Sequence, residues 1–219
     1  MMRLYQFATS PFCAKVRKIL DFKGIDYEAI EVDYVERMEL VMASGQMMVP
    51  ALTLDNDDTL VDSDRIAMAL EEHYPEPTLF PQAWQGVHLA LARYFDTELE
   101  DALFRAAVPL ELTHYRRQGA DREALWRLIR ERKYGACFVE QMLREHSASL
   151  SRAHELLAPL EGSLGDRAFI LGRIGYADFA LYGQLTYFAI SGTLAIPADF
   201  PNLRAFFERM NRISSAVDA

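Results

Sequence analysis

The chain has 219 residues, of which 51% are hydrophobic and 25% are charged. This is the composition of an ordinary globular protein, with enough residues for one large domain or two modest ones. The formal net charge is −9, and the first 80 residues hold 15 acidic but only 7 basic side chains. Nucleic acid is therefore not expected as a partner, because binding to its phosphates requires a basic surface.

The cysteines indicate the cellular compartment of the protein, and the histidines indicate whether it binds a metal. Cys13 and Cys137 form neither a CxxC pair nor a disulfide framework, which fits a reducing compartment. The five histidines show no metal-ligand spacing, so no metal site is expected. The first residues lack the apolar core of a signal peptide, and no apolar run has the length of a membrane span. We expect a cytoplasmic protein that does not associate with a membrane.

The first 76 residues predict the order βαβ-α-ββ-α, an α/β arrangement. Apolar alternation bounded by turn residues indicates the strands, and apolar spacing of three and four indicates the helices. Asp62 and Ser63 are expected to cap the third helix, whose apolar face comprises Ile66, Ala67, Leu70 and Tyr74. The expected strands are 3–7, 27–32, 47–54 and 59–61, and the first two helices are 14–23 and 35–44.

A proline-rich linker and an all-helical region follow. Three prolines between residues 75 and 81 stop the third helix and stiffen the connection. We therefore predict a domain at 1–76, a linker at 77–82 and an all-α domain at 83–219. The expected helices are 83–117 with an interruption at Pro109, 121–144, 147–162 with a kink or an end at Pro159, 176–191 and 201–213.

The stretch from Thr9 to Cys13 joins the first strand to the first helix. Ser10 is placed to cap the helix, and Pro11 suits its first turn, where the missing N–H costs nothing. The free N–H groups and the positive end of the helix dipole favour an anion or a thiolate there. The same Ser-Pro pattern is also a common helix start without any chemistry, so the motif gains weight only from the rest of the chain.

A second helix start lies at Ile174 to Phe179. Gly175 is placed as the N-cap, and Asp178 is the residue whose carboxylate reaches back to the free N–H groups. Asp178 lies among apolar neighbours, where a carboxylate must be hydrogen-bonded. We expect Gly175 and Asp178 to form a structural cap rather than a catalytic site.

Four elements together resemble the soluble glutathione transferase superfamily. The run from Ser10 to Arg17 is similar to the motif of serine-type members, and to a glutaredoxin CPFC whose first cysteine is replaced by Ser10. Val49-Pro50 resembles the cis-proline element of thioredoxin-like folds, and Asp62-Ser63 resembles the pair that holds the glutamyl end of glutathione. Ala177-Asp178 resembles the capping box of the C-terminal domain. The matches extend over nearly the whole chain in the order the family shows.

The resemblance implies a thioredoxin-like N-terminal domain, an all-α C-terminal domain, a homodimer, and glutathione as co-substrate without a metal. Ser10, with Phe12 beside it, would contact the glutathione sulfur. Val49, followed by Pro50, would pair its backbone with the cysteinyl part. Ser63 and its helix would bind the glutamyl carboxylate, and Asp62 the glutamyl amine.

The run before Pro50 departs from the family pattern. It lacks the usual first proline and has a longer step from Gly45. The residue that holds the glycyl carboxylate is therefore open, and Arg37 and Gln46 are the two candidates. Gly175 also replaces the usual serine or threonine cap, a change that costs only about a few tenths of a kcal/mol.

Other residues compete with Ser10 for the catalytic role. Cys13 occupies the resolving position of the glutaredoxin-like motif, but it also falls on the inner face of its helix. Tyr5 is a candidate because some family members use a tyrosine of the first strand. The aromatic set Tyr94, Phe95, Phe104 and Tyr115 either lines a pocket for the second substrate beside Ser10 or belongs to the core.

The sequence thus predicts a transferase in which Ser10 stabilises the glutathione thiolate for attack on a small hydrophobic electrophile. One alternative is an inactive binding or regulatory protein with the same fold. Another is a glutathione-dependent thiol-disulfide reductase or isomerase that uses Cys13. The longer serine-cysteine motif typical of the isomerase branch is absent.

Overall fold

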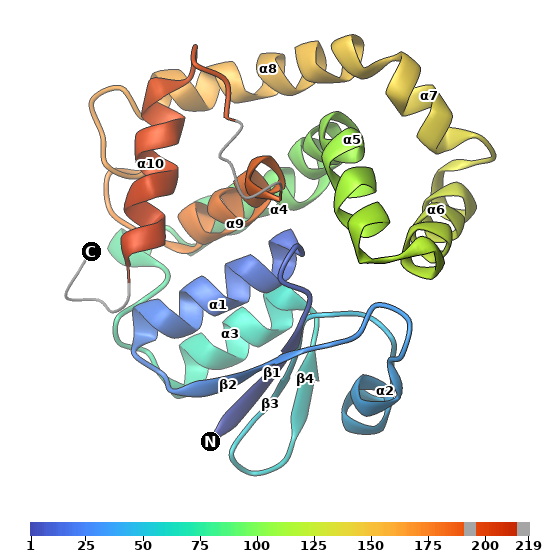
Figure 1. Cartoon of the computed structure of the whole chain (residues 1–219). Helices are drawn as coiled ribbons and strands as arrows, with labels where there is room; N and C mark the ends of the chain where they lie inside the picture. Colours follow the sequence, from blue (N-terminus) through green and yellow to red (C-terminus); the bar gives the residue numbers. More distant parts are fainter. Residues whose placement is uncertain (191–195, 214–219) are drawn as a thin grey trace.

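The computed structural model describes residues 1–190 and 196–213. Its N-terminal part is a four-stranded sheet of order β2-β1-β3-β4 (Figure 1). β1 runs parallel to β2 and antiparallel to β3, which in turn is antiparallel to β4. The strands are β1 (Met2–Gln6), β2 (Tyr27–Glu31), β3 (Ala51–Thr53) and β4 (Thr59–Val61).

Alternation along the strands divides the core between the two faces of the sheet. Leu4 and Leu52 point into the main core with α1 and α3, whereas Tyr5 and Ala51 form a smaller cluster with Leu40 of α2. Successive strand residues point to opposite faces of the sheet. The pairing register of β1 with β3 therefore determines which residues lie on each face. The helices that cover the sheet are α1 (Pro11–Lys23), α2 (Met38–Ser44) and α3 (Ser63–His73).

Two elements of this part are shorter than expected. The helix expected from Val35 begins at Met38, because the Asp33 carboxylate accepts hydrogen bonds from the N–H groups of Val35 and Glu36 and holds them in a turn. The strand expected over 47–54 pairs only at Ala51–Thr53, after the cis peptide bond before Pro50.

Tyr74 was expected on the apolar face of α3, and this was wrong. The helix ends at His73, and Tyr74 is 38% exposed. Ile66, Ala67 and Leu70 are buried as expected. The order βαβ-α-ββ-α and the helical region after it are confirmed.

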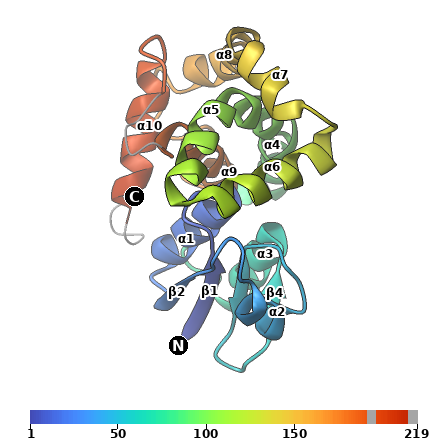
Figure 2. The ribbon, with the colours of Figure 1, turned by 45° about the vertical axis from the view of Figure 1, so that its right-hand side comes forward.

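The rest of the described chain is helical and lies on the α1 side of the sheet (Figures 1 and 2). α9 packs against α1, so α1 lies between the sheet and the helical part. The division of the chain at residues 77–82 stays a prediction. The helices are α4 (Gln85–Tyr94), α5 (Glu100–Gln118), α6 (Ala120–Tyr134), α7 (Phe138–Arg144), α8 (His146–Ser163), α9 (Tyr176–Leu185) and α10 (Pro201–Arg212).

Pro109 does not interrupt its helix, contrary to expectation, and of the two outcomes expected at Pro159, a kink or an end, the helix does not end there. Pro109 lies within α5 and Pro159 within α8. Each proline removes one backbone hydrogen bond, but buried residues on both sides hold the helix in its packed position. The irregularity of the first helical stretch is instead a π-helical turn at Phe95–Leu99.

The helix expected over 121–144 is two helices, and the expected helix over 176–191 is shorter. Gly135 and Cys137 have φ of +107° and +62°, values that an α-helix does not use, so α6 ends and α7 starts anew. α9 ends at Leu185 and is followed by a 3₁₀ turn at Thr186–Ala189. Ser191 lies outside the described residues, and α10 ends at Arg212.

The start of α9 is buried and satisfied by side chains. Asp178 is fully buried, and its carboxylate accepts hydrogen bonds from the backbone N–H groups of Gly175, at 3.0 Å, and Ile170, at 2.9 Å. Burial nevertheless raises the pKa of the Asp178 carboxyl to about 7. The carboxylate therefore supplies the reach-back half of a capping box and ties the preceding loop to α9.

The other half of this cap comes from a different helix. His88 of α4 is buried, and its Nδ1 accepts the N–H of Ala177 at 3.3 Å. A Cβ on Gly175 would lie 2.3 Å from Cε1 of His88 and 3.0 Å from the carbonyl oxygen of Leu79. The imidazole thus occupies the place of an N-cap side chain, which explains why residue 175 is glycine rather than serine or threonine.

Capping by a histidine predicts a pH-dependent stability. Burial lowers the pKa of His88 below its ordinary value. Since the unfolded state then binds the proton more readily, His88 stabilises the fold fully above about pH 6.5, and this stabilisation is lost as the pH falls toward the folded-state pKa. We expect His88→Gln, which keeps an acceptor but does not titrate, to reduce the loss of unfolding free energy between pH 7 and pH 5.

Denaturant unfolding of both proteins across this range measures the difference. Asp178 lies at the same helix end, and its raised pKa makes the fold more stable as the pH falls, which opposes the effect of His88. The slope of unfolding free energy against pH is therefore compared between wild type and His88→Gln, because the wild-type slope alone contains both effects. Identical slopes would show that His88 does not act as a titrating cap.

Candidate active site

A cleft of about 420 Å³ lies where α1, the loop before β3, the start of α3 and the end of α4 meet. Residues from both the N-terminal part and the helical part line it. The sequence places these segments far apart, and the fold brings them together at one end of the sheet (Figure 2). Six residues expected to bind glutathione line the cleft: Phe12, Gln46, Val49, Pro50, Asp62 and Ser63.

Ser10 is the N-cap of α1. Its Oγ accepts the N–H of Cys13 at 3.3 Å, and Pro11 occupies the first helical position. Since Oγ serves as an acceptor in this bond, its proton is available to a ligand. Ser10 is half-buried and does not itself line the cleft, but Phe12, in the same turn of α1, does.

Cys13 is enclosed in the core. Its side chain is 0% exposed, and burial raises the pKa of its thiol to about 11, with the nearby Ser10 side chain opposing the rise only in part. A reactive cysteine requires access and a lowered pKa. The alternative role of Cys13 as a redox nucleophile is therefore at odds with the structure.

Tyr5 does not reach the cleft either. It is 2% exposed and belongs to the cluster between the sheet and α2, because its neighbours Leu4 and Gln6 alternate with it along β1. Its hydroxyl is thus on the face of the sheet opposite α1. Tyr5 therefore lies away from the cleft, which favours Ser10 over Tyr5.

The backbone at Val49 forms one wall of the cleft. The peptide bond between Val49 and Pro50 is cis. Within residues 1–190 and 196–213, Val49 makes no backbone hydrogen bond, and the ladder with β1 starts only at Ala51. The N–H and C=O of Val49 therefore present an unpaired edge to which an extended peptide can bind.

The start of α3 forms the second wall. Asp62, at φ +77°, caps the helix by accepting the N–H groups of Asp64 and Arg65 with Oδ1. Its second carboxylate oxygen is not used by the cap. Ser63 is 5% exposed, and no described residue forms a hydrogen bond with its hydroxyl. A hydroxyl without a partner among the described residues, at the positive end of a helix, is arranged to bind an anion.

Arg37 and Gln46, the two candidates for binding the glycyl carboxylate of glutathione, differ in position. Arg37 is buried, donates to the carbonyl oxygens of Tyr34 and Met47, and stacks over the rings of Phe7 and Tyr34. Arg37 therefore stabilises the loop before β3 and does not line the cleft. Gln46 does line it, although its amide also donates to the Met48 carbonyl at 3.0 Å.

The expected aromatic pocket is largely core. Phe95 and Phe104 are 0% and 2% exposed, because helical spacing turned them inward. Tyr94 is half-buried and packs against Phe95. Tyr115 is 5% exposed, but its hydroxyl lies 3.5 Å from Oγ1 of Thr9, next to Ser10. Of this set, only Tyr115 is placed beside the start of α1.

The cleft contains charged residues that the sequence reasoning missed. Nζ of Lys15, itself 1% exposed, lies 2.7 Å from Oδ1 of Asp64 and 2.5 Å from Oδ2 of Asp96. Burial acts against ionisation of Asp64, but the Lys15 ammonium outweighs it and lowers the pKa of that carboxyl. Burial raises the pKa of Asp96, with Lys15 opposing. The only sequence signal was a lysine on the buried face of the first helix.

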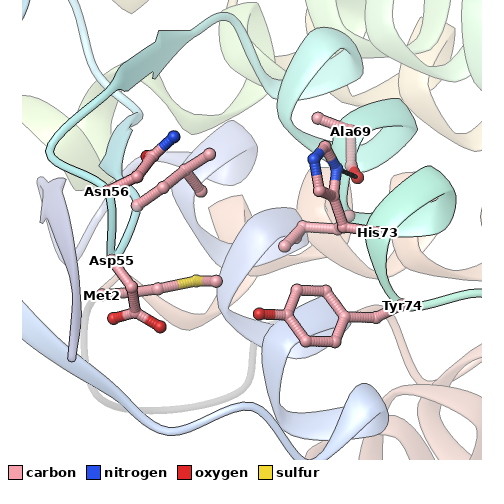
Figure 3. Close-up of a pocket in the computed structure, with 8 residues that line it drawn as sticks. Met2, Asp55, Asn56, Ala69, His73 and Tyr74 are labelled. Carbon is pink, nitrogen blue, oxygen red and sulfur yellow. Dashed lines mark hydrogen bonds between the residues drawn. The ribbon is translucent and has the colours of Figure 1, made fainter.

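Arg93 and Thr97, from the end of α4 and the π-helical turn, also line the cleft. They were missed because they belong to the helical part, where the sequence offered no motif. A hollow of about 240 Å³ at the other end of the sheet contains none of the expected site residues (Figure 3). In this hollow, Nδ1 of His73 lies 2.8 Å from the carbonyl oxygen of Ala69. We assign the hollow no role.

An α/β part with a cis proline before β3, followed by a helical part, defines the thioredoxin-like class of folds with a helical C-terminal region. Residues 4–78 match the family model described as glutathione S-transferase, N-terminal domain, and residues 140–209 match glutathione S-transferase, C-terminal domain. The chain belongs to the soluble glutathione transferase superfamily.

Individual relatives agree with this family. The chain is 27% identical to glutathione S-transferase 1 of Dianthus caryophyllus, covering 99% of this chain and 95% of that protein. It is 40% identical over 75 residues to prostaglandin E synthase 2 of Mus musculus, which covers 33% of this chain and only 19% of that protein. A solved glutathione S-transferase of Methylobacterium radiotolerans, complexed with glutathione sulfonate, has a TM-score of 0.66 and 26% identity, covering 99% of this chain and 93% of that one.

Among residues 1–190 and 196–213, no three His, Cys, Asp or Glu side chains gather as metal ligands would. No helix in the described part of the chain combines the length and the apolar character needed to cross a membrane.

Proposed function

We propose that the protein is a glutathione-dependent transferase in which Ser10 stabilises the glutathione thiolate for attack on a small hydrophobic electrophile. The observation that carries the proposal is the assembly of the Val49 edge, Asp62 and Ser63 in one cleft beside the N-terminus of α1. Each of these groups has a hydrogen-bonding capacity that the described residues leave unused.

The three ends of the tripeptide have matching partners. The cysteinyl backbone pairs with the N–H and C=O of Val49 and turns the sulfur toward Ser10. The glutamyl carboxylate binds Ser63 and the free N–H groups of α3, and the amine binds the second oxygen of Asp62. Gln46 is favoured over Arg37 for the glycyl carboxylate, because Gln46 lines the cleft while Arg37 is occupied in the loop.

The second substrate enters beside the start of α1, near Tyr115. Its small apolar character is inferred from the aromatic neighbourhood of Thr9 and Ser10, where Tyr115 packs against Tyr34. The two other candidates for this pocket, Tyr94 and Phe104, receive no support, since Phe104 is buried against the rings of Tyr134 and Phe138 and Tyr94 packs against Phe95.

A homodimer and a cytoplasmic location complete the proposal. Trp84 and Val87, three positions apart at the start of α4, are exposed and apolar, and a second copy of the chain would cover them. Cys13 and Cys137 are both free thiols, as a reducing compartment requires.

The test is a conjugation assay with glutathione and a panel of activated aryl halides, epoxides and unsaturated carbonyl compounds. The proposal predicts saturable turnover of at least one class, with loss of the free thiol. Reduction of a mixed disulfide without any conjugation would support the thiol-disulfide alternative. Binding of glutathione without turnover of any substrate would support the binding-protein alternative.

A further inference from the structure

We infer that Arg93 is a specificity-determining residue that binds the α-carboxylate of the γ-glutamyl group from the helical side of the cleft. This inference rests on the proposed function, because it requires glutathione in the cleft. It assigns a ligand contact to the second domain that neither the Asp62-Ser63 motif nor the start of α1 predicts.

The position of Arg93 is the first observation. It lies in the last turn of α4 and lines the cleft together with Ser63 and Asp64. Its side chain is exposed and forms no ion pair or hydrogen bond with any residue of the part of the chain that the structure describes. Within the described residues, the guanidinium therefore has unused donors in the cleft that the first residues of α3 also line.

The second observation is that the neighbouring carboxylates already have other partners. Asp64 pairs with Lys15 at 2.7 Å and accepts the hydroxyl of Tyr176 at 2.5 Å. Asp96 pairs with Lys15 at 2.5 Å and accepts the amide of Gln184 at 2.7 Å. The Lys15 ammonium offsets one of the two carboxylate charges, and the charge of Arg93 contributes, after Lys15, to the lowered pKa of Asp64. Arg93 nevertheless forms no direct hydrogen bond or ion pair with either carboxylate, so its guanidinium donors remain free for a ligand.

Two positive features then converge on one place in the cleft. The start of α3 offers its dipole and the free hydroxyl of Ser63, and Arg93 approaches from α4. A carboxylate fits this combination, since a guanidinium binds both carboxylate oxygens with parallel hydrogen bonds. The unused oxygen of Asp62 lies at the same helix end and takes the adjacent amine.

The site therefore recognises the complete α-amino acid head group of the thiol. The carboxylate lies between Ser63 and Arg93, and the amine binds Asp62. A thiol peptide that lacks the carboxylate leaves the guanidinium without a partner and loses a charge-assisted hydrogen bond. Since Arg93 belongs to the helical part, the ligand also links the two parts of the chain.

The test compares two ligands and three proteins by calorimetric titration. The ligands are glutathione and γ-aminobutyryl-cysteinyl-glycine, which lacks only the α-carboxylate. The proteins are wild type, Arg93→Gln, and Arg132→Gln as a matched control at an exposed position of α6. We expect Arg93→Gln to weaken glutathione binding about tenfold and to leave binding of the analogue unchanged. Arg132→Gln should match wild type with both ligands.

Arg93→Lys separates charge from geometry. A point charge cannot bind both carboxylate oxygens, so this variant should recover only part of the lost affinity for glutathione. Equal weakening of both ligands by Arg93→Gln, or no weakening of either, would overturn the assignment while leaving the proposed function intact. Failure of wild type to bind glutathione at all would overturn both.

Discussion

Replacement of Ser10 by alanine is expected to lower turnover about tenfold or more. The variant keeps the helix, the Val49 edge and the start of α3, but it removes the hydroxyl that we propose contacts the glutathione sulfur. Glutathione should still bind, because its peptide ends are held elsewhere. The loss therefore falls on kcat rather than on the affinity for the thiol.

The size of the effect follows from the acidity of a thiol. With a reference pKa near 8.5, only about 3% of a free thiol is ionised at neutral pH. A hydrogen bond to the charged sulfur contributes about 1.5–3 kcal/mol, enough to lower the thiol pKa by about one to two units. The dipole of α1 adds about 0.3–1 kcal/mol. Together these terms make much of the bound thiol a thiolate without a general base.

The measurement is kcat and the pH profile of turnover for wild type and Ser10→Ala, with thiolate absorbance of the bound glutathione as a direct readout. Ser44→Ala is the control, since its hydroxyl turns to the Leu40 carbonyl at 2.7 Å. Loss of the N-cap of α1 also costs about 1 kcal/mol of stability, so unfolding is measured alongside. Unchanged turnover and an unchanged pH profile would remove Ser10 from the mechanism.

Gly175→Ser is expected to destabilise the protein by about 2 kcal/mol, although serine is the better N-cap residue in an isolated helix. The new Cβ would lie 2.3 Å from Cε1 and 2.8 Å from Nε2 of His88, and 3.0 Å from the Leu79 carbonyl. His88 is buried and the carbonyl is backbone, so neither can move freely. The steric cost outweighs the capping gain.

A double-mutant cycle isolates the cause. In a His88→Ala background the clash with the ring is removed and the serine hydroxyl can accept the Ala177 N–H in its place. Gly175→Ser should then cost less than about 0.5 kcal/mol, measured by denaturant unfolding. Equal costs in the two backgrounds would show that His88 does not take the place of the cap.

Local patterns predicted the N-terminal part well, because its signals are short-range. Asp62 and Ser63 precede a clear apolar helix face, and Val49-Pro50 precedes an apolar strand, so both could be located before any packing was known. The structure gathers them in one cleft. Their expected contacts with glutathione remain proposals.

The errors arose where tertiary packing outweighs local preference. Pro109 and Pro159 suggested breaks, yet buried neighbours hold both helices continuous. Phe104 was left open between a pocket and the core, and it lies in the core, where helical spacing turns it inward. The place of Arg93 in the cleft could not be predicted from the sequence, because it depends on how α4 packs near the start of α3. No local sequence pattern encodes that packing.

The most direct test of the proposed glutathione site is calorimetric titration of glutathione into wild type and Ser63→Ala near neutral pH. Ser63 combines burial, an unpartnered hydroxyl and a helix N-terminus in the cleft. The account predicts saturable binding by wild type and binding weakened about tenfold or more by Ser63→Ala. Absence of binding by wild type, or equal binding by both proteins, would contradict it.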